Sequence, residues 1–380
     1  YAATWDSLAV TVVPNGTDKI GSTNQSATLS TKGQSVTFVY VDGVQGWINT
    51  MDSTSNVRGA PPFVSATVSG ACNTLVTAPD CANAKIATFV NPGTFNVISL
   101  SPCAAQNEVS YMVVGGGGAG GTAYYAGGAG AGGFREAKSP QATGYTASPL
   151  CGYPTPGNRI TVSASPYPIT VGGGGAGHPA PPATCAPNGN GANGVDSVFA
   201  SITSTGGGRG GYNNPRCAGT GFPGGSGGGG MSGTGGCTVA GGNGNDPPTA
   251  PPQGNPGGPY QYASPNRQGG GGGGAMCSGA TGACSSAKAG GDGAGLPTGF
   301  GANGVPCGSF RYYAGGGAGG SGAVTPASGG KGGGGAGAEP GGNGTDNTGG
   351  GGGGGSGYPG AVAGGSGGSG IVVIRYKYQN

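Results

Sequence analysis

Short strand-like runs mark the beginning of the chain, and in the run at residues 35–41 apolar and polar residues alternate. They occupy residues 8–13, 27–30, 35–41 and a stretch that starts at residue 46. Alternation with period two is typical of strands, and the Asn15-Gly16 pair between the first two runs favours a tight turn. The pattern predicts a small antiparallel β module over residues 1–57. A module of this size buries too small a core to be stable alone, so we expect it to pack on neighbouring chains or modules.

A second set of alternating runs follows the first. Residues 63–68, 84–90 and 94–100 are strand-like, and Asn91-Pro92-Gly93 forms a turn before the last of these runs. The segment 58–109 is therefore predicted to be a second small β module or connector. Residues 109–114 form the last strand-like run before glycine becomes abundant.

The distribution of glycine sets the next boundary. Of the 98 glycines, 8 lie in residues 1–114 and the other 90 in residues 115–380, and the chain also holds 30 prolines. Because both residue types break helices and dilute side-chain packing, this composition excludes an ordinary globular enzyme. The glycines follow no strict Gly-X-Y period, which excludes collagen. Strand-like islands at 159–171, 195–205 and 371–378 argue against a flexible linker, so we predict a glycine-rich domain over residues 110–380.

The missing Cβ of glycine indicates how such a domain folds. Glycine segments can adopt the extended helix with three residues per turn, whose N–H and C=O groups point outward and lack internal partners. Several such helices side by side can satisfy one another, provided that no side chain keeps the backbones apart. The predicted fold class is therefore all-β plus non-regular: short antiparallel β modules followed by packed polyglycine II-type helices with β islands, and essentially no α-helix.

The closing run, residues 371–378, also alternates. Val372 and Ile374 fall on one face of a strand, and Ile371, Val373 and Arg375 fall on the other. We predict a half-buried strand that pairs with residues 111–114, so that the glycine-rich domain starts and ends at one place.

Charge and cysteine content limit the kinds of partner and cross-link that the sequence predicts. Only 27 residues are charged and the net charge is +3, which gives no reason to expect nucleic-acid binding or membrane insertion. The ten cysteines contain no Cys-x-x-Cys pair and the chain has one histidine, His178, so we expect no metal site. An even number of cysteines in turn-rich sequence favours disulfides, and hence an oxidising environment outside the cytoplasm.

Candidate chemistry is sparse. The patterns of type G-x-G-x-x-G arise by chance at this glycine density and open no helix, so no cofactor is expected. The acidic residues after position 115 are isolated in the sequence, and His178 has no nucleophile motif to pair with. We therefore expect a protein that is not an enzyme.

The tyrosines of the glycine-rich region carry more information. Tyrosine in loops rich in Gly, Ser and Asn is typical of adaptable binding surfaces, because it offers a large contact area with few rotatable bonds. An alternative interpretation is that these rings lie flat over the glycine helices as caps. The candidate receptor-binding residues are Tyr124, Tyr125, Tyr212, Tyr260, Tyr262, Tyr312, Tyr313 and Tyr358.

Five segments in succession resemble a known family. They are residues 109–121, 132–136, 167–177, 197–211 and 367–376. In sequence and order they are similar to the glycine-rich domain of tail and fibre proteins of tailed bacteriophages, over about residues 84 to 376. Residues 10–47 also resemble a small β module found in phage fibre and virion-attached proteins.

This resemblance implies a function. It implies a virion tail-fibre or tail-tip protein, extracellular when functional, in which variable loops on a glycine-rich scaffold bind a host glycan or outer-membrane protein. The expected partners are other virion and tail proteins and further copies of the chain, as a homotrimer. One alternative is a purely structural virion protein, such as a head fibre or decoration, and another is a surface-polysaccharide depolymerase.

Overall fold

The computed structural model describes most of the chain. The described residues are 5, 7–31, 35–52, 63–122, 125–141, 144–179, 191–212, 219–231, 238–261, 268–282, 288–321, 326–357 and 362–379. Within them, helical structure is confined to short 3₁₀ turns, η1 (Ala104–Asn107), η2 (Pro156–Asn158) and η3 (Thr298–Phe300). The prediction of an essentially all-β chain without α-helix is confirmed.

The N-terminal module consists of two hairpins. β1 (Val10–Val12) pairs with β2 (Ala27–Leu29), and β3 (Val36–Asp42) pairs with β4 (Gly46–Asp52), all antiparallel. The four strands lie in the runs that the alternation picked out. Their shared core is small: Ile20, Ala27 and Leu29 are its buried members.

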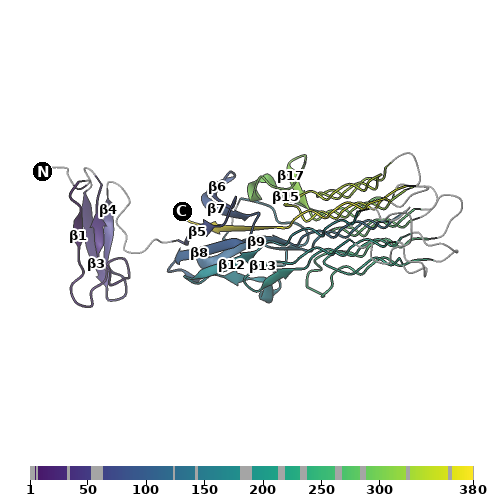
Figure 1. Cartoon of the computed structure of the whole chain (residues 1–380). Coiled ribbons are helices and arrows are strands. Elements are labelled where there is room, and N and C mark those ends of the chain that lie inside the picture. The colour runs from purple at the N-terminus through teal and green to yellow at the C-terminus, as the bar shows by residue number, and fades with distance from the viewer. Residues whose placement is uncertain are drawn as a thin grey trace.

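The following strands build a sandwich of two sheets (Figure 1). The strands are β5 (Ser65–Ser69), β6 (Thr74–Ala78), β7 (Cys81–Phe89), β8 (Gly93–Ser99), β9 (Glu108–Val114), β10 (Phe134–Ala137), β11 (Ile160–Thr161), β12 (Pro166–Thr170), β13 (Ser197–Phe199), β14 (Ile202–Ser204) and β18 (Ile371–Lys377). One sheet has the order β10-β9-β18-β7-β6, with β11 also on β9, and the other has the order β14-β13-β12-β8-β5. Residues 63–109 thus share both sheets with strands of the glycine-rich region.

A third, smaller sheet covers the outer face of the first. It contains β15 (Ala294–Pro297), β17 (Phe310–Tyr313) and β16 (Val305–Cys307), in that order. Leu296 and Tyr313 of this sheet pack in one apolar cluster with Val373 of β18. A second cluster lies between the two large sheets and includes Phe95 and Phe199. The chain therefore has an apolar core on each face of its central sheet.

The closing strand β18 lies at the centre of that sheet. It pairs antiparallel with β9, where Ile371 lies opposite Val114, and also with β7. The predicted pairing with residues 111–114 is confirmed. The prediction of half-burial is wrong, because Val372 and Ile374 enter one core while Ile371 and Val373 enter the other. A strand between two covering layers has no solvent face.

The glycine segments run away from the sheets side by side (Figure 1). Residues 115–121 show the pattern of their contacts. The N–H groups of residues 115, 118 and 121 donate to segment 125–133, those of 116 and 119 to segment 191–196, and those of 117 and 120 to segment 362–370. Successive N–H groups donate to three different neighbouring segments, and every third residue donates to the same segment. This repeat is characteristic of a helix with three residues per turn.

The carbonyl groups of the same helix accept hydrogen bonds from further segments. Those of residues 116 and 119 accept from segment 205–212, those of 118 and 121 from segment 349–357, and that of 117 from Gly175. The helix at 115–121 therefore has six neighbouring segments, three reached by its donors and three by its acceptors. Residues 269–274 have six neighbouring segments in the same way. The packed polyglycine II-type helices that the sequence predicts are present, and we call them the glycine lattice.

Glycine is required where the lattice is tight. A Cβ built on Gly272 would overlap the carbonyl oxygen of Ala129, and one on Gly352 would overlap that of Gly365. The neighbour in each case is backbone, which cannot turn aside as a side chain can. Alanine is found where there is room for a methyl group, as at Ala119 and Ala318, which are fully buried.

Candidate functional site

The lattice carries a set of described residues to its end away from the sheets. Residues 115–122 lead away from β9 and residues 125–133 lead back into β10, while other segments reverse beside the sheets, as at residues 224–226 and 346–349. The described far ends of the lattice segments lie at the points farthest from the sheets (Figure 1). We call the described residues at these points the tip: Thr122, Tyr125, Tyr212, Val239, Tyr260, Gln268, Gly282, Ser321 and Ser356. Isolated bridges join neighbours here, Tyr125 with Ser356, Gln268 with Ser321, and Tyr260 with both Val239 and Gly282.

Three of the eight candidate tyrosines lie at the tip. Tyr125 and Tyr212 are half-buried, while the side chain of Tyr260 is enclosed and only 1% exposed. The hydroxyl of Tyr260 is buried without a hydrogen-bond partner among the described residues. Tyr125 and Tyr212 therefore keep part of their rings accessible, and Tyr260 serves as a packed ring.

Two other candidates lie away from the tip. Tyr312 and Tyr313 belong to β17, beside the sandwich. Tyr313 is 2% exposed, and its hydroxyl donates to the carbonyl of Asn303 at 2.6 Å. The interpretation of Tyr313 as part of a loop surface does not hold, because the third sheet buries its ring against the central sheet. Tyr124, Tyr262 and Tyr358 lie outside the described residues.

The side chain of Arg209 lies beside the ring of the tip residue Tyr212. The guanidinium of Arg209 lies 5.6 Å from the ring centroid of Tyr212 and 3.8 Å from that of Phe222. It also donates to the carbonyl of Gly191 at 3.2 Å. Partial burial lowers the pKa of Arg209, yet arginine stays charged in proteins. Together, Arg209, Tyr212 and Phe222 form a stacked cation and two rings on the side of the lattice near the tip.

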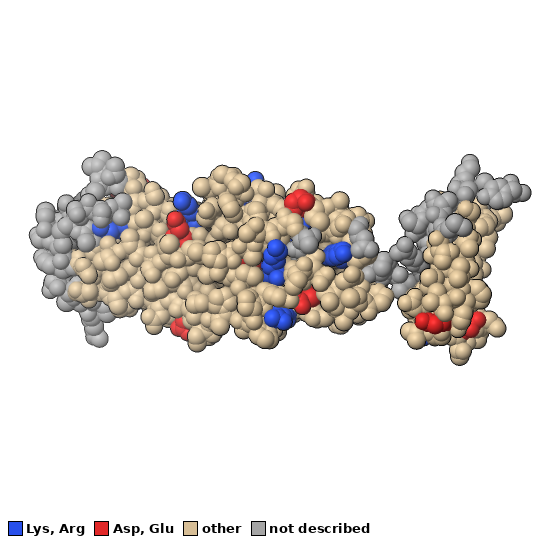
Figure 2. Space-filling model, turned by 180° about the vertical axis from the view of Figure 1, so that it is seen from behind, with Lys and Arg blue, Asp and Glu red and all other residues tan. Residues whose placement is uncertain are grey.

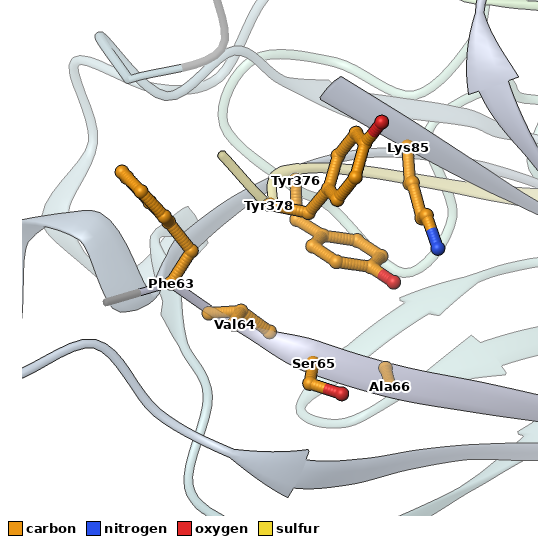
Figure 3. A pocket seen from close by; sticks show the side chains of 7 residues that line it. All are labelled: Phe63, Val64, Ser65, Ala66, Lys85, Tyr376 and Tyr378. Carbon is orange, nitrogen blue, oxygen red and sulfur yellow. The ribbon is translucent and has the colours of Figure 1, made fainter. Parts of the chain in front are cut away.

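A pocket opens at the other end of the sandwich (Figure 3). Its volume is about 230 Å³, and it is lined by Phe63, Val64, Ser65, Ala66, Lys85, Tyr376 and Tyr378. β5 supplies one wall and the end of β18 the other. No local pattern in the sequence reveals this pocket, because its residues come from segments about 300 positions apart.

A buried carboxyl group lies on the outer face of the central sheet. Glu136 of β10 is 2% exposed, and its Oε2 accepts hydrogen bonds from the backbone N–H of Ser148 at 3.0 Å and from its hydroxyl at 2.5 Å. Its other oxygen has no partner among the described residues. Burial raises the pKa of Glu136 to about 7, against the hydrogen bonds from Ser148 and the charge of Lys138, which lower it. The groups that the structure places against this carboxyl group include Ser148, Lys138 and Tyr145, together with Cys151 as a bridge partner.

The cysteines do not form the expected cross-links where the structure describes them. Cys72, Cys103, Cys151, Cys277 and Cys307 carry free thiols, so the disulfide prediction is wrong for these five. They stand on separate turns and strands, and backbone hydrogen bonds across the lattice order the glycine segments instead. Cys81 packs against the outer core. Cys185, Cys217, Cys237 and Cys284 lie outside the described residues.

The described part of the chain contains neither a metal-binding cluster nor a membrane-spanning helix. In it, His, Cys, Asp and Glu side chains form no group of three or more that could hold a metal ion. The same residues contain no helix with the length and hydropathy needed to cross a bilayer. The face in Figure 2 carries few charged side chains, scattered among uncharged ones.

Comparison with known proteins gives the family. The model of the glycine-rich domain family matches residues 90–377, which is most of the chain. The chain therefore belongs to the glycine-rich domain family. A search of curated proteins finds no significant match.

Proposed function

We propose that this member of the glycine-rich domain family is a tail-fibre or tail-tip protein of a tailed bacteriophage that binds a bacterial surface receptor through its tip. The observation that carries the proposal is the lattice, which holds Tyr125 and Tyr212 at its end away from the sheets. At ~3.1 Å per residue, a segment of about eight residues holds the tip roughly 25 Å beyond the sheets. A surface on so stiff a support loses little conformational freedom when it binds, which favours affinity.

The chemistry of the tip suits a receptor that is a glycan or an outer-membrane protein. Tyr125 and Tyr212 offer partly accessible rings, and Arg209 offers a cation beside the ring of Tyr212. Rings with a polar end bind sugars and protein surfaces through both contact area and hydrogen bonds. With so few charges, recognition at the tip depends on shape and hydrogen bonds more than on long-range attraction.

The N-terminal module supports assembly with other virion proteins and with further copies of the chain. Its small core leaves apolar side chains in contact with water, among them Val39 (45% exposed), Val41 and Val44, while the rings of Tyr40 and Trp47 pack edge to face at 5.6 Å. Exposed apolar residues in one small module favour association. We propose a homotrimer, in which three tips bind together and weak single contacts become avidity.

Binding of the fluorescently labelled full-length protein to host cells tests the proposal. Tyr212→Ala should reduce binding about tenfold, as expected for a central aromatic contact, without a change in melting temperature. The matched control is Phe310→Ala, an exposed aromatic of β17 away from the tip, which should bind like the unchanged protein.

Other outcomes would replace the proposal. Absence of saturable binding to host cells, together with antibody labelling of capsids and not of tails, would favour a structural head fibre or decoration. Loss of surface polysaccharide from treated cells would favour a depolymerase. Sedimentation of the purified protein as a monomer at micromolar concentration would contradict the trimer.

A further inference from the structure

The pocket at the end of the sandwich away from the tip has walls drawn from the apolar core. Val64, Ala66 and Tyr376 are buried members of the cluster between the two large sheets, and Phe63 is also buried. The pocket is therefore an entrance to the core, left open where β5 begins and β18 ends (Figure 3). Any group that enters it exchanges water for aliphatic and aromatic surface, which favours an apolar body.

The rim of the pocket is cationic. The ammonium group of Lys85 lies 4.8 Å from the ring centroid of Tyr378, and that of Lys377, next to the pocket, lies 5.1 Å from the ring centroid of Phe63. The ion pairs of the described residues are Lys331 with Asp292 and Arg375 with Asp80, so neither rim lysine is neutralised by a described carboxylate. Among the described residues that line the pocket, none is acidic. The rim therefore attracts an anionic group.

Hydroxyl groups also line the pocket. Ser65 and Tyr378 carry them, and Figure 3 shows Ser65 apart from the ammonium group of Lys85. The ammonium group is suited to a carboxylate, and the hydroxyl groups can donate hydrogen bonds elsewhere in the pocket.

The volume limits the size of the ligand. About 230 Å³ corresponds to the space of roughly seven to eight water molecules at ~30 Å³ each. It lies below the ~300 Å³ at which pockets for drug-sized ligands begin. One ring with one acidic group fills it.

We propose that this pocket binds a small organic carboxylate with an apolar, single-ring body, the carboxylate on Lys85 and the ring against Val64, Ala66 and Tyr376. The site lies at the end of the sandwich away from the tip and is independent of receptor binding. Its ligand is recognised by one charge at the rim and by apolar contact below it.

Titration of the full-length protein with benzoate, followed by isothermal calorimetry and by NMR of the aromatic side chains, tests the proposal. We expect saturable binding and shifted signals of Tyr376 and Tyr378. Lys85→Met should weaken binding about tenfold, the size of one lost charged hydrogen bond, and leave the melting temperature unchanged. The matched control Lys331→Met removes a surface lysine far from the pocket and should bind benzoate normally.

Three analogues separate the parts of the proposal. Benzamide keeps the ring without the charge and should bind at least tenfold more weakly, so equal binding would contradict the role of Lys85. Acetate keeps the charge without the ring and should bind weakly. Glucuronate places hydroxyl groups against the apolar walls, so binding as tight as benzoate would contradict the apolar body and point to acidic sugars. Absence of saturable benzoate binding would overturn the site altogether.

Discussion

Asp80 and Arg375 form an ion pair at 2.8 Å although 295 positions separate them in the sequence. Asp80 lies in the turn between β6 and β7, and Arg375 lies on β18 with its side chain fully buried. The guanidinium also donates to the carbonyl of Gly299 and lies 5.4 Å from the ring centroid of Tyr145. The ion pair therefore joins the central strand to the β6–β7 turn of its own sheet, and the other contacts of Arg375 join it to the layer that covers the outer face.

Removal of the carboxylate from this pair should destabilise the fold. In Asp80→Asn, Arg375 keeps its charge inside the protein but loses its anionic partner. Loss of one partner of a fully buried pair costs about 3–5 kcal/mol, and the partial exposure of Asp80 reduces the expected cost to about 2 kcal/mol. Urea denaturation measures the free energy of unfolding. Lys331→Gln breaks the exposed pair with Asp292 and should change it by less than about 0.5 kcal/mol. Equal effects of the two variants would mean that burial of Arg375 is unimportant.

Two glycines of the lattice differ in what surrounds them. Gly272 is buried, donates to Gly317 and would place a Cβ on the carbonyl of Ala129. Gly173 is exposed, and a Cβ there would meet no atom within 4 Å. Gly272→Ala should lower the free energy of unfolding by about 3 kcal/mol or more, because neighbouring helices must separate and lose hydrogen bonds. Gly173→Ala should be neutral or stabilise by up to about 1 kcal/mol, since it restricts the unfolded chain.

Chemical denaturation of both variants decides whether the glycine region is scaffold or tether. A lattice requires a large difference between the two positions. If Gly272→Ala unfolds like the unchanged protein, the backbones are not held at contact distance and the region acts as a flexible linker.

Much of the fold could be predicted from local sequence patterns. Alternation located the strands of the N-terminal module and the pairing of β18 with β9, and the missing Cβ predicted the lattice. Burial of β18 on both faces was missed, although the unbroken apolar run from Ile371 to Ile374 is typical of a strand covered on both sides. Alternation shows which residues share a face but not whether another layer covers it.

The positions of the candidate sites could not be predicted from local sequence patterns in the same way. Tyr125, Tyr212 and Tyr260 reach one end of the molecule only through the lattice, whose neighbours are distant in sequence. The burial of Tyr313 depends on the third sheet packing on β18, which no local pattern of residues 294–313 reveals. The pocket around Lys85 and Tyr376 likewise exists only after β5 and β18 come together.

Stability should fall with rising pH because of Glu136. Burial raises the pKa of this carboxyl group to about 7 in the folded protein, from about 4.5 when it is exposed to water. The folded state therefore binds the proton of Glu136 more tightly than the unfolded state does. This proton binding stabilises the fold fully below about pH 4.5, and the stabilisation is lost as the pH rises through 7. The shift corresponds to about 3 kcal/mol.

Urea denaturation of the unchanged protein and Glu136→Gln between pH 4 and pH 8.5 measures this effect. The Gln side chain can still accept from Ser148 and never ionises, so the variant should lose the pH-dependent step and be the more stable protein above pH 7. Parallel pH profiles for the two proteins would show that Glu136 does not titrate with the transition. The tip is separate from β10, so binding to host cells should be unaffected by the substitution.

Tyr313 should contribute to stability and not to receptor binding. Its ring is enclosed between the third sheet and β18, and burial raises the pKa of its hydroxyl group above the ordinary value. Tyr313→Ala should lower the free energy of unfolding by about 3–5 kcal/mol, as large aromatic deletions in a core do. Tyr313→Phe removes only the bond to Asn303 and should cost about 1 kcal/mol. Thermal and urea unfolding give these values, and binding of the folded Phe variant to host cells gives the second readout. The expected result is a loss of stability with normal binding. Reduced cell binding by Tyr313→Phe with unchanged stability would instead indicate that Tyr313 contacts the receptor.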